Sequence, residues 1–301
     1  MVLAAPSRPG RLRHAGGLEL GIGGAESNVA IALSRLGVFS GWISHLGAEE
    51  PGRLVLDRVR AEGVDTSRVS AVEGHPTGLY LRERVGSQTQ VYYYRQGSAA
   101  STLSPGDFDP EYLEGAKFLH LTGITPALSE SCREFTLWAA RQAREAGVRV
   151  SFDVNYRSKL WPAKLARKFF DEILLEVDLL FVGAEEARAL WGRDDTEFAQ
   201  ELAGEREVVL KRGAAGSVAV VGGESVEHPP FEVAEVDPIG AGDAFDAGYL
   251  AGHLWGLDPY ERGRVANALG ACCVMTPGDY EGLPDRAELE RFLSGAEELG
   301  R

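Results

Sequence analysis

The chain has 301 residues, 44% hydrophobic and 25% charged, which is enough to bury the core of a globular α/β enzyme as one unit. Its formal net charge of −14 argues against nucleic acid or an anionic membrane surface as the main partner, because both require a basic face. No apolar run reaches the ~20 residues of a membrane span, and three cysteines without zinc-binding spacing indicate reduced thiols and a cytoplasmic location.

The first clear pattern along the chain is a pair of segments in which apolar and polar residues alternate. Residues 77–84 (TGLYLRER) and 89–97 (TQVYYYRQG) alternate apolar and polar side chains around a short turn at 85–88, which predicts an antiparallel hairpin. We expect a small β-sheet lid from segments at about 10–24 and 75–98. Three consecutive tyrosines at an exposed strand edge also predict a homo-oligomer that forms through this lid.

From about residue 116, short apolar strands alternate with amphipathic helices. This alternation predicts right-handed βαβ units, a parallel sheet covered on both faces, and ligands at the carboxyl ends of its strands. Gly123, residues 155–157 and Gly183 fall at such ends and are therefore candidates for a site. The expected strands are 116–124, 148–155 and 177–183, and the expected helices are 129–147 with Ser129 as N-cap, 164–176 and 185–192.

The strongest motif is DPIGAGDAFDAG at residues 237–248. Gly240, Ala241 and Gly242 precede a helix that begins with Asp243, so their backbone N–H groups would point at an anion near the helix N-terminus. An aspartate at this point can accept the proton of an attacking hydroxyl while the amides hold a phosphate in transfer. Taken alone, the motif is equally compatible with a simple turn in which Asp243 only stabilises the helix dipole.

Residues 237–252 (DPIGAGDAFDAGYLAG) closely resemble the C-terminal signature of the ribokinase-like (PfkB) carbohydrate kinases. Residues 23–37 (GGAESNVAIALSRLG) resemble the N-terminal glycine signature of this family, and two signatures in order are specific. The resemblance implies a ribokinase-like, doubly wound, mostly parallel sheet flanked by helices, with a small β-sheet lid, in a single domain over residues 1–301. It also implies ATP and Mg²⁺, allows a monovalent cation, and makes Asp243 the base and the Gly240–Asp243 amides the anion hole.

The same resemblance assigns residues around the nucleotide. Segment 208–223 (VVLKRGAAGSVAVVGG) has the pattern of a strand, a glycine turn and a second strand, and in the family it borders the nucleotide. Asn267 would lie near the adenine, although it could equally be a polar residue on a helix face. The residues that the resemblance assigns to the cofactor are Asn155, Lys211, Gly213, Gly216, Gly240, Gly242 and Asn267.

The chain departs from the family pattern at two places. Many relatives carry an N-x-x-E motif that supports Mg²⁺, but these positions read Gly183-Ala184-Glu185-Glu186, which leaves Glu186 to act on the metal indirectly, through water. The family also begins with a β-strand that runs into a glycine-bearing turn, for which MVLAAPSRPG is too short. We expect either a late start codon or a truncated sheet edge, and favour the first.

Within the family, segments at 77–83, 91–99, 121–129 and 153–161 resemble 2-keto-3-deoxygluconate kinases. Tyr93 and Arg95 are two residues apart on one expected strand and share a face, and Arg157 at the end of strand 148–155 is a second cation. Two arginines in the cleft of an acidic protein suit a carboxylate, which they can hold with paired hydrogen bonds. The residues expected to contact the sugar acid are Gly24, Asn28, Tyr80, Tyr93, Arg95, Arg157 and Asp279.

These observations lead to one hypothesis with two alternatives. The chain would transfer the γ-phosphoryl group of ATP to the terminal hydroxyl of 2-keto-3-deoxygluconate, with Asp243 as general base. One alternative is another PfkB sugar kinase, such as a fructokinase. The other is a catalytically silent sugar-acid-binding or regulatory protein of the same fold. For the individual residues, Arg95 could equally be a solvated strand charge, Arg157 a surface ion pair, and the tyrosines a lid or dimer contact.

Overall fold

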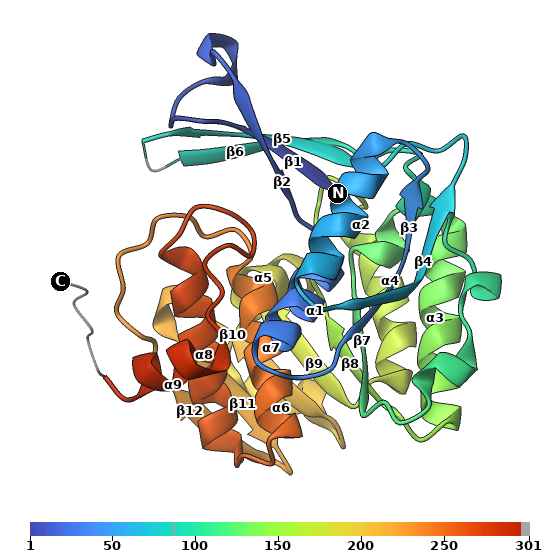
Figure 1. The fold of residues 1–301 in the computed structure, drawn as a ribbon. Helices are drawn as coiled ribbons and strands as arrows, with labels where there is room; N and C mark the ends of the chain where they lie inside the picture. The colour runs from blue at the N-terminus through green and yellow to red at the C-terminus, as the bar shows by residue number, and fades with distance from the viewer. Residues whose placement is uncertain (87, 296–301) are drawn as a thin grey trace.

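The computed structural model describes residues 1–86 and 88–295; residue 87 of the expected hairpin turn and residues 296–301 of the expected domain lie outside this description. The largest sheet has the strand order β12-β11-β10-β9-β8-β7 (Figure 1). Strands β7 to β10 run parallel, and β11 and β12 continue antiparallel, which confirms the expected mostly parallel sheet. Its strands are β7 (Phe118–Thr122), β8 (Arg149–Asp153), β9 (Leu179–Gly183), β10 (Glu207–Lys211), β11 (Ser217–Val221) and β12 (Glu224–His228).

Helices cover both faces of this sheet. Successive side chains of a strand point to opposite faces, so each strand contributes to an apolar cluster on either side. In β9, Leu180 and Val182 join one apolar cluster, while Leu179 and Phe181 join the other. Helices α3 (Glu130–Glu145), α4 (Ala163–Ile173), α5 (Ala184–Trp191) and α6 (Thr196–Ala203) cover the first face. Helices α1 (Ala25–Arg35), α7 (Ala241–Leu254) and α8 (Pro259–Val274) lie on the second face. Helices α2 (Glu50–Ala61) and α9 (Arg286–Leu293) add to the same apolar cluster, α2 against β3 and β4 and α9 against α8.

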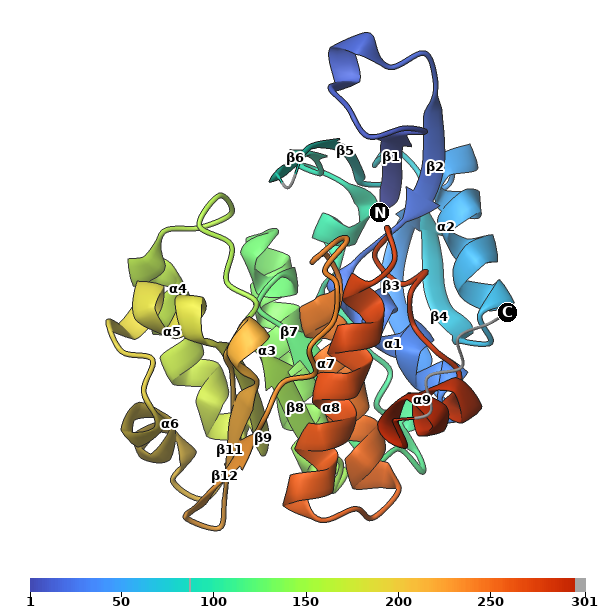
Figure 2. The ribbon, with the colours of Figure 1, turned by 90° about the vertical axis from the view of Figure 1, so that its left-hand side faces the viewer.

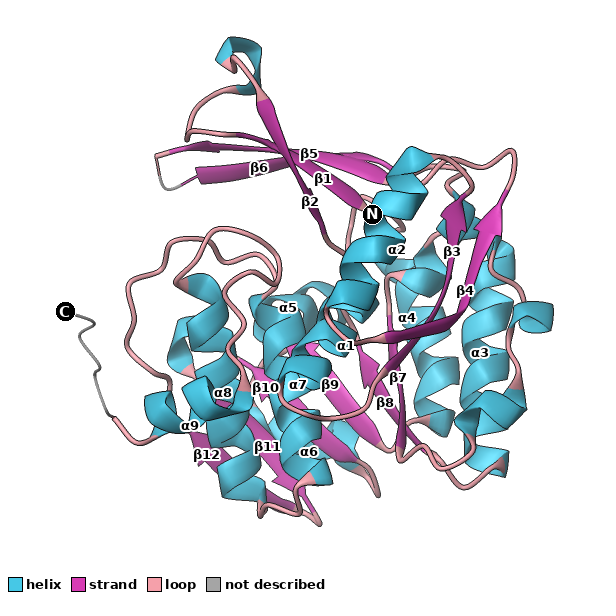
Figure 3. Cartoon of the chain, viewed as in Figure 1, coloured by secondary structure: helices cyan, strands magenta, loops and turns pink. Residues whose placement is uncertain are grey.

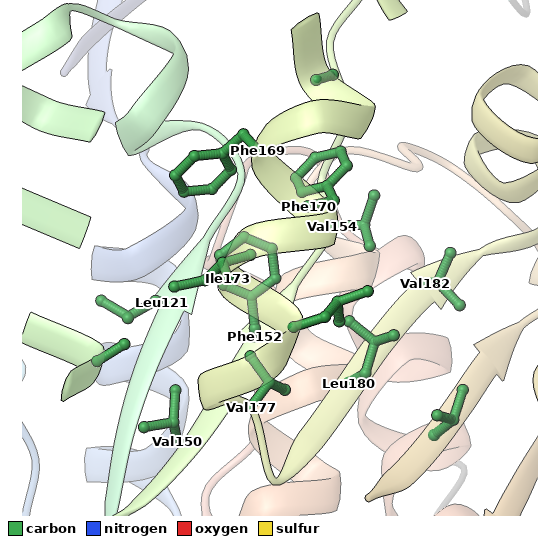
Figure 4. Close-up of a cluster of buried hydrophobic side chains, with 14 of the residues drawn as sticks. Leu121, Val150, Phe152, Val154, Phe169, Phe170, Ile173, Val177, Leu180 and Val182 are labelled. Atoms are coloured by element: carbon green, nitrogen blue, oxygen red, sulfur yellow. The ribbon is translucent and has the colours of Figure 1, made fainter. Parts of the chain in front are cut away.

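Local sequence explains how these helices begin and pack. The Ser129 hydroxyl accepts a hydrogen bond from the Cys132 amide at 3.1 Å, so Ser129 is the N-cap that the sequence predicted for α3. Helix α4 then packs Phe169, Phe170 and Ile173 onto the sheet, around Phe152 of β8 (Figure 4).

Two glycines of α7, Gly248 and Gly252, set the short distance between α7 and α8. A Cβ at Gly248 would lie 2.8 Å from the Cα of Ala266, and one at Gly252 would lie 3.1 Å from the Cα of Arg262. The two helices therefore approach more closely than larger residues would allow. This packing fixes the position of α7, whose N-terminus carries the conspicuous glycine motif.

A four-stranded sheet stands over the carboxyl ends of the main strands (Figure 2). Its strand order is β2-β1-β5-β6, and β5 and β6 form the antiparallel hairpin that the alternating pattern predicted. Strand β1 was not expected in the lid; it pairs with β2 on one side and with β5 on the other. The strands are β1 (Val2–Pro6), β2 (Leu18–Ile22), β5 (Leu79–Val85) and β6 (Gln88–Tyr94).

A third, two-stranded sheet lies beside the body of the molecule (Figure 3). Its strands β3 (Gly41–Gly47) and β4 (Asp65–Val72) run parallel to each other and are joined by α2. In the described part of the chain, no helix combines the length and apolar character needed to cross a membrane. The single-domain boundary at residues 1–301 stays a prediction.

Candidate active site

One cavity of about 1040 Å³ lies beneath the lid, at the carboxyl ends of β8, β9 and β10. It brings together residues that are far apart in the sequence and come from the lid, the main sheet, α1 and α7. The predicted site residues that line it are Gly24, Asn28, Tyr80, Tyr93, Arg95, Asn155, Arg157, Glu186, Lys211, Gly240, Gly242, Asp243 and Asp279.

Asp243 lies in the first turn of α7 and faces this cavity. Its Oδ2 atom accepts a hydrogen bond of 2.7 Å from Nδ2 of Asn28, a buried residue of α1. Burial raises the pKa of Asp243 to about 7, although the hydrogen bond from Asn28 opposes that shift. A carboxyl group with this pKa can both accept and release a proton near neutral pH, as a general base requires.

Gly240 is the residue that makes the start of α7 possible. Its φ of 82° lies in the left-handed region, and a Cβ on it would lie 2.0 Å from the carbonyl oxygen of Asp279. Any other residue would therefore strain the backbone and displace the loop that carries Asp279. The first turn of α7 then leaves free N–H groups beside Asp243, which suit an anion.

Lys211, the last residue of β10, is held between two buried carboxylates. Its Nζ atom lies 3.0 Å from Oδ1 of Asp153 and 3.0 Å from Oδ1 of Asp246. Burial disfavours the ammonium, but the two carboxylates outweigh burial and raise the pKa of Lys211, so it stays charged. A Cβ built on Gly242 would lie 3.7 Å from Nζ, so this cation sits close to the start of α7.

Glu186 is another acidic residue of the cavity lining, and its charge interacts with those of Asp153 and Lys211. Its Oε2 atom accepts a 3.0 Å hydrogen bond from the Gly183 amide, and burial raises its pKa to about 7. Within residues 1–86 and 88–295, no three His, Cys, Asp or Glu side chains gather as a metal-binding group. That Glu186 would support Mg²⁺ through water stays a prediction.

Tyr93, Arg95 and Arg157 form the cationic side of the cavity. The Arg95 guanidinium stacks on the Tyr93 ring, 4.3 Å from its centroid, although β6 ends at Tyr94 and Arg95 follows it. Burial lowers the pKa of Arg95, and the nearby charge of Arg157 lowers it further. Arg157 lies four residues beyond β8, not at its end, and its Nη1 atom is 3.6 Å from Oε1 of Glu186.

Arg82 of the lid contacts both Asp279 and Asp237, and Asp237 lies in the loop before α7. Arg82 of β5 lies 3.4 Å from Oδ1 of Asp279 and 2.9 Å from Oδ2 of Asp237. Burial raises the pKa of Asp279 to about 6, although Arg82 and Tyr80 oppose the shift. A Cβ on Gly23 would lie 2.2 Å from both the Tyr80 hydroxyl and Oδ2 of Asp279, so the absence of a side chain at this glycine lets these two groups pack against it.

The comparisons with known proteins agree with this geometry. A family model described as pfkB family carbohydrate kinase matches residues 2–286. The chain belongs to the PfkB family. It is therefore a sugar kinase with the ribokinase-like fold, which confirms the resemblance found in its two signatures.

Individual relatives cover nearly the whole chain. The chain is 38% identical to 2-dehydro-3-deoxygluconokinase of Bacillus subtilis, over 95% of its length and 90% of that protein's. It is 35% identical to 2-dehydro-3-deoxygalactonokinase of Haloferax volcanii, over 99% of its length and 95% of the relative's. A solved structure of a putative ribokinase II of E. coli in complex with ATP and Mg²⁺ has a TM-score of 0.89 at 26% identity and covers 98% of this chain and 96% of that one. ATP and Mg²⁺ are the cofactors of the PfkB kinases.

Three residues expected at the nucleotide lie outside the lining of the cavity. Gly213 and Gly216 flank the turn between β10 and β11, and a Cβ on Gly216 would lie 2.2 Å from the carbonyl oxygen of His228. The amide of Asn267 donates to the carbonyl oxygens of His228 and Pro229 at 3.2 and 3.0 Å. In this PfkB kinase Gly216 and Asn267 thus both lie against residues 228–230, and the Gly216 amide donates to the Gly213 carbonyl oxygen at 3.0 Å.

Sequence reasoning did not find Asp153, Asp246, Arg82 and Asp237, which hold the site's charged groups in place. Asp153 and Asp246 had detectable signals. Asp153 lies two residues before the end of the predicted strand 148–155, and Asp246 lies three residues after Asp243 on the same helix. For Asn155, which the sequence already predicted as a site residue, the backbone conformation is a further indication that only the structure reveals. Its φ of 37° is a strained value for a residue other than glycine, and its side-chain amide donates to Oδ2 of Asp153 at 3.1 Å.

Proposed function

We propose that this PfkB kinase transfers the γ-phosphoryl group of ATP to the terminal hydroxyl of 2-keto-3-deoxygluconate and forms the 6-phosphate. The observation that carries the proposal is the presence of Arg95 and Arg157 in the same cavity as Asp243. A sugar acid has a carboxylate at one end and a hydroxyl at the other. Two guanidinium groups suit the first, and a base beside a helix N-terminus suits the second.

In the proposed reaction, Asp243 takes the proton of the terminal hydroxyl as its oxygen attacks the γ-phosphorus. The amides of Gly240, Ala241 and Gly242 stabilise the negative charge on the transferred group, and Lys211 adds a fixed positive charge nearby. Mg²⁺ would supply charge neutralisation on the β- and γ-phosphates when bound, with Glu186 as the nearby carboxylate that can hold its waters. Closure of the lid would exclude water, the competing acceptor.

The substrate proposal rests on the arginines together with the relatives. Two relatives named for kinases of 2-dehydro-3-deoxy sugar acids share 38% and 35% of residues with this chain. Neutral hexoses offer the two guanidinium groups no anion. The proposed contacts to the sugar acid are Gly24, Asn28, Tyr80, Tyr93, Arg95, Arg157 and Asp279.

The test is a coupled ADP-release assay with Mg·ATP and a panel of 2-keto-3-deoxygluconate, 2-keto-3-deoxygalactonate, gluconate, fructose and ribose. Turnover confined to the keto-deoxy acids supports the proposal, and their ratio gives the preference between the gluconate and galactonate forms. Turnover on fructose or ribose would support a sugar kinase in which Arg95 and Arg157 do not select for a carboxylate. Binding of the acids without turnover would instead support the silent binding protein.

We also propose that the lid forms a homo-oligomer through its outer face. Leu20, Leu81 and Tyr92 lie in one row across the sheet, and Leu20 and Tyr94 remain 53% and 60% exposed. Sedimentation as a monomer at micromolar concentration would contradict this proposal. The cytoplasmic location and a monovalent cation stay predictions.

A further inference from the structure

Arg82 of the lid is a buried charge that has no part in the reaction proposed above. It lies on β5 two residues after Tyr80, so the two side chains leave the strand on the same face. Tyr80 lines the cavity, whereas Arg82 lies outside the lining. The Arg82 side chain is only 10% exposed, so the carboxylates beside it must offset the cost of burying a guanidinium group.

Both carboxylate partners of Arg82 belong to loops beside the start of α7. Its Nη1 atom lies 2.9 Å from Oδ2 of Asp237, in the segment before that helix. The same atom lies 3.4 Å from Oδ1 of Asp279, in the segment that follows α8. Both aspartate side chains are buried. One guanidinium group therefore joins the lid to two loops from other parts of the chain.

Asp237 passes this contact on to the backbone on each side of it. Its Oδ1 atom accepts a 3.3 Å hydrogen bond from the Ile239 amide two residues later, which holds residues 237–239 in a turn. Its Oδ2 atom, which faces Arg82, also accepts a 3.2 Å hydrogen bond from the Gly278 amide. The carboxylate of Asp237 thus ties the turn before α7 to the loop at residue 278.

The two loops meet at Gly240. A Cβ on Gly240 would lie 2.0 Å from the carbonyl oxygen of Asp279, so the backbone at Gly240 packs directly against that loop. The amides at residues 240–243 are those proposed to hold the transferred phosphoryl group, and such donors act only when they are aimed correctly. A shift of either loop would move them, and a misplacement of about 1 Å can lower a rate by about 10²-fold.

We propose that Arg82 is a positioning residue for phosphoryl transfer: its guanidinium holds the loops of Asp237 and Asp279 together and so sets the position of the amides at residues 240–243. This inference rests on the proposed role of those amides. Arg82 acts through the two aspartates rather than on a substrate. Because β5 belongs to the lid, the amides are held in place while this strand lies against the two loops.

The experiment compares Arg82→Ala with Arg84→Ala in the ADP-release assay, using the panel sugar that the wild type phosphorylates fastest. Arg84 is the matched control because it lies two residues further along β5, where its Nε atom donates to the Gly86 carbonyl oxygen in an exposed contact. We expect kcat to fall about 10²-fold in Arg82→Ala and to change less than about twofold in Arg84→Ala. The Kd for the sugar, measured by calorimetry, should change less than roughly tenfold in both variants, because Arg82 lies outside the cavity lining.

Chemical rescue separates positioning from a general loss of structure. Guanidinium chloride at about 20 mM, far below a denaturing concentration, supplies a free guanidinium for the space that the Arg82 side chain leaves. It should raise kcat of Arg82→Ala at least roughly fivefold and leave Arg84→Ala unchanged. Tetramethylammonium chloride at the same concentration is the control, because its cation carries the charge without N–H donors and should give no recovery.

Equal kcat values in Arg82→Ala and Arg84→Ala would overturn the proposal, as would equal recovery in the two salts. If Arg82→Ala does not fold, Asp237→Asn replaces it: the asparagine keeps an oxygen for the Ile239 amide but loses the charge that faces Arg82. Its kcat must then fall while the Kd for the sugar changes less than roughly tenfold, and an unchanged kcat would also overturn the proposal.

Failure of the proposed function would look different. If the wild type turns over none of the sugars, the kinase reaction proposed above is wrong, and hydrogen exchange in the unliganded protein decides the inference. Exchange at residues 237–243 should be at least roughly tenfold faster in Arg82→Ala than in Arg84→Ala, and guanidinium chloride should slow it again. Equal exchange in the two variants would overturn the inference.

Discussion

The two ends of the cavity, which we call the transfer end and the sugar end after their proposed roles, are built differently. At the transfer end, Lys211 is held by two carboxylates at 3.0 Å and Asp243 by Asn28 at 2.7 Å, and all of these groups come from strand ends and helices of the core. At the sugar end, Arg95 follows the lid hairpin and Arg157 lies in a loop with 47% of its side chain exposed.

This difference shows which part of the site is organised before ligands arrive. The transfer end pairs its charges within the protein, so its geometry is fixed at little further cost on binding. At the sugar end, the charge of Arg157 lowers the pKa of Arg95 even though Arg157 lies 3.6 Å from Glu186, so an anion between the two guanidinium groups would relieve their repulsion. The comparison therefore predicts catalytic and stability effects at the first end and affinity effects at the second.

The largest effect is expected from Asp243→Asn. Without a base for the sugar hydroxyl, kcat should fall by about 10²- to 10⁴-fold, while sugar binding measured by calorimetry changes little. Asp285→Asn, at the N-cap of α9 and outside the cavity lining, serves as a control that should keep kcat. Full activity in Asp243→Asn would refute the assigned base and remove the contrast between the two ends.

The next largest effect is on stability. Lys211→Met leaves Asp153 and Asp246 buried side by side without their shared cation, and should lower the free energy of unfolding by about 3 kcal/mol in urea titrations. Adding Asp246→Asn should recover part of that loss, because burial and Asp153 already raise the pKa of Asp246, and the asparagine leaves a single carboxyl group to be buried without the cation. An unfolding midpoint equal to that of the wild type would mean that the pairing contributes nothing at the transfer end.

At the sugar end, Arg157→Ala and Arg95→Ala should each raise KM for the sugar acid roughly ten- to hundredfold, the loss expected for a hydrogen bond to a charged group. KM for ATP should stay nearly constant. Arg188→Ala on α5, which lies outside the cavity lining, is the matched control. Equal increases in both KM values would indicate damage to the whole site rather than loss of a carboxylate contact.

The same comparison explains what could be predicted from the sequence. The turn at Gly240 and the proposed base Asp243 are local features, so a twelve-residue motif predicts them, and the alternation in residues 77–97 likewise predicts the lid hairpin. The bond between Lys211 and Asp246 joins residues 35 positions apart and leaves no local pattern. Strand β1 was missed in the lid because its five residues, VLAAP, do not alternate and end in proline.

The smallest predicted effect is the pH dependence of kcat/KM. Burial raises the pKa of Asp243 to about 7, so the carboxyl is protonated at lower pH and cannot accept the hydroxyl proton. Activity should therefore fall about tenfold per pH unit below 7 and level off above it.

Two variants test whether Asp243 causes the expected fall in kcat/KM below pH 7. Burial also raises the pKa of Glu186 to about 7, so Glu186 could produce a similar pH dependence. If Asp243 is responsible, Glu186→Gln must still show the fall in kcat/KM below pH 7. Asn28→Ala removes the hydrogen bond that favours the ionised form and should move the midpoint upward. A wild-type midpoint below 5 would mean that Asp243 is ionised throughout, and that the transfer end is more solvated than its packing against Asn28 indicates.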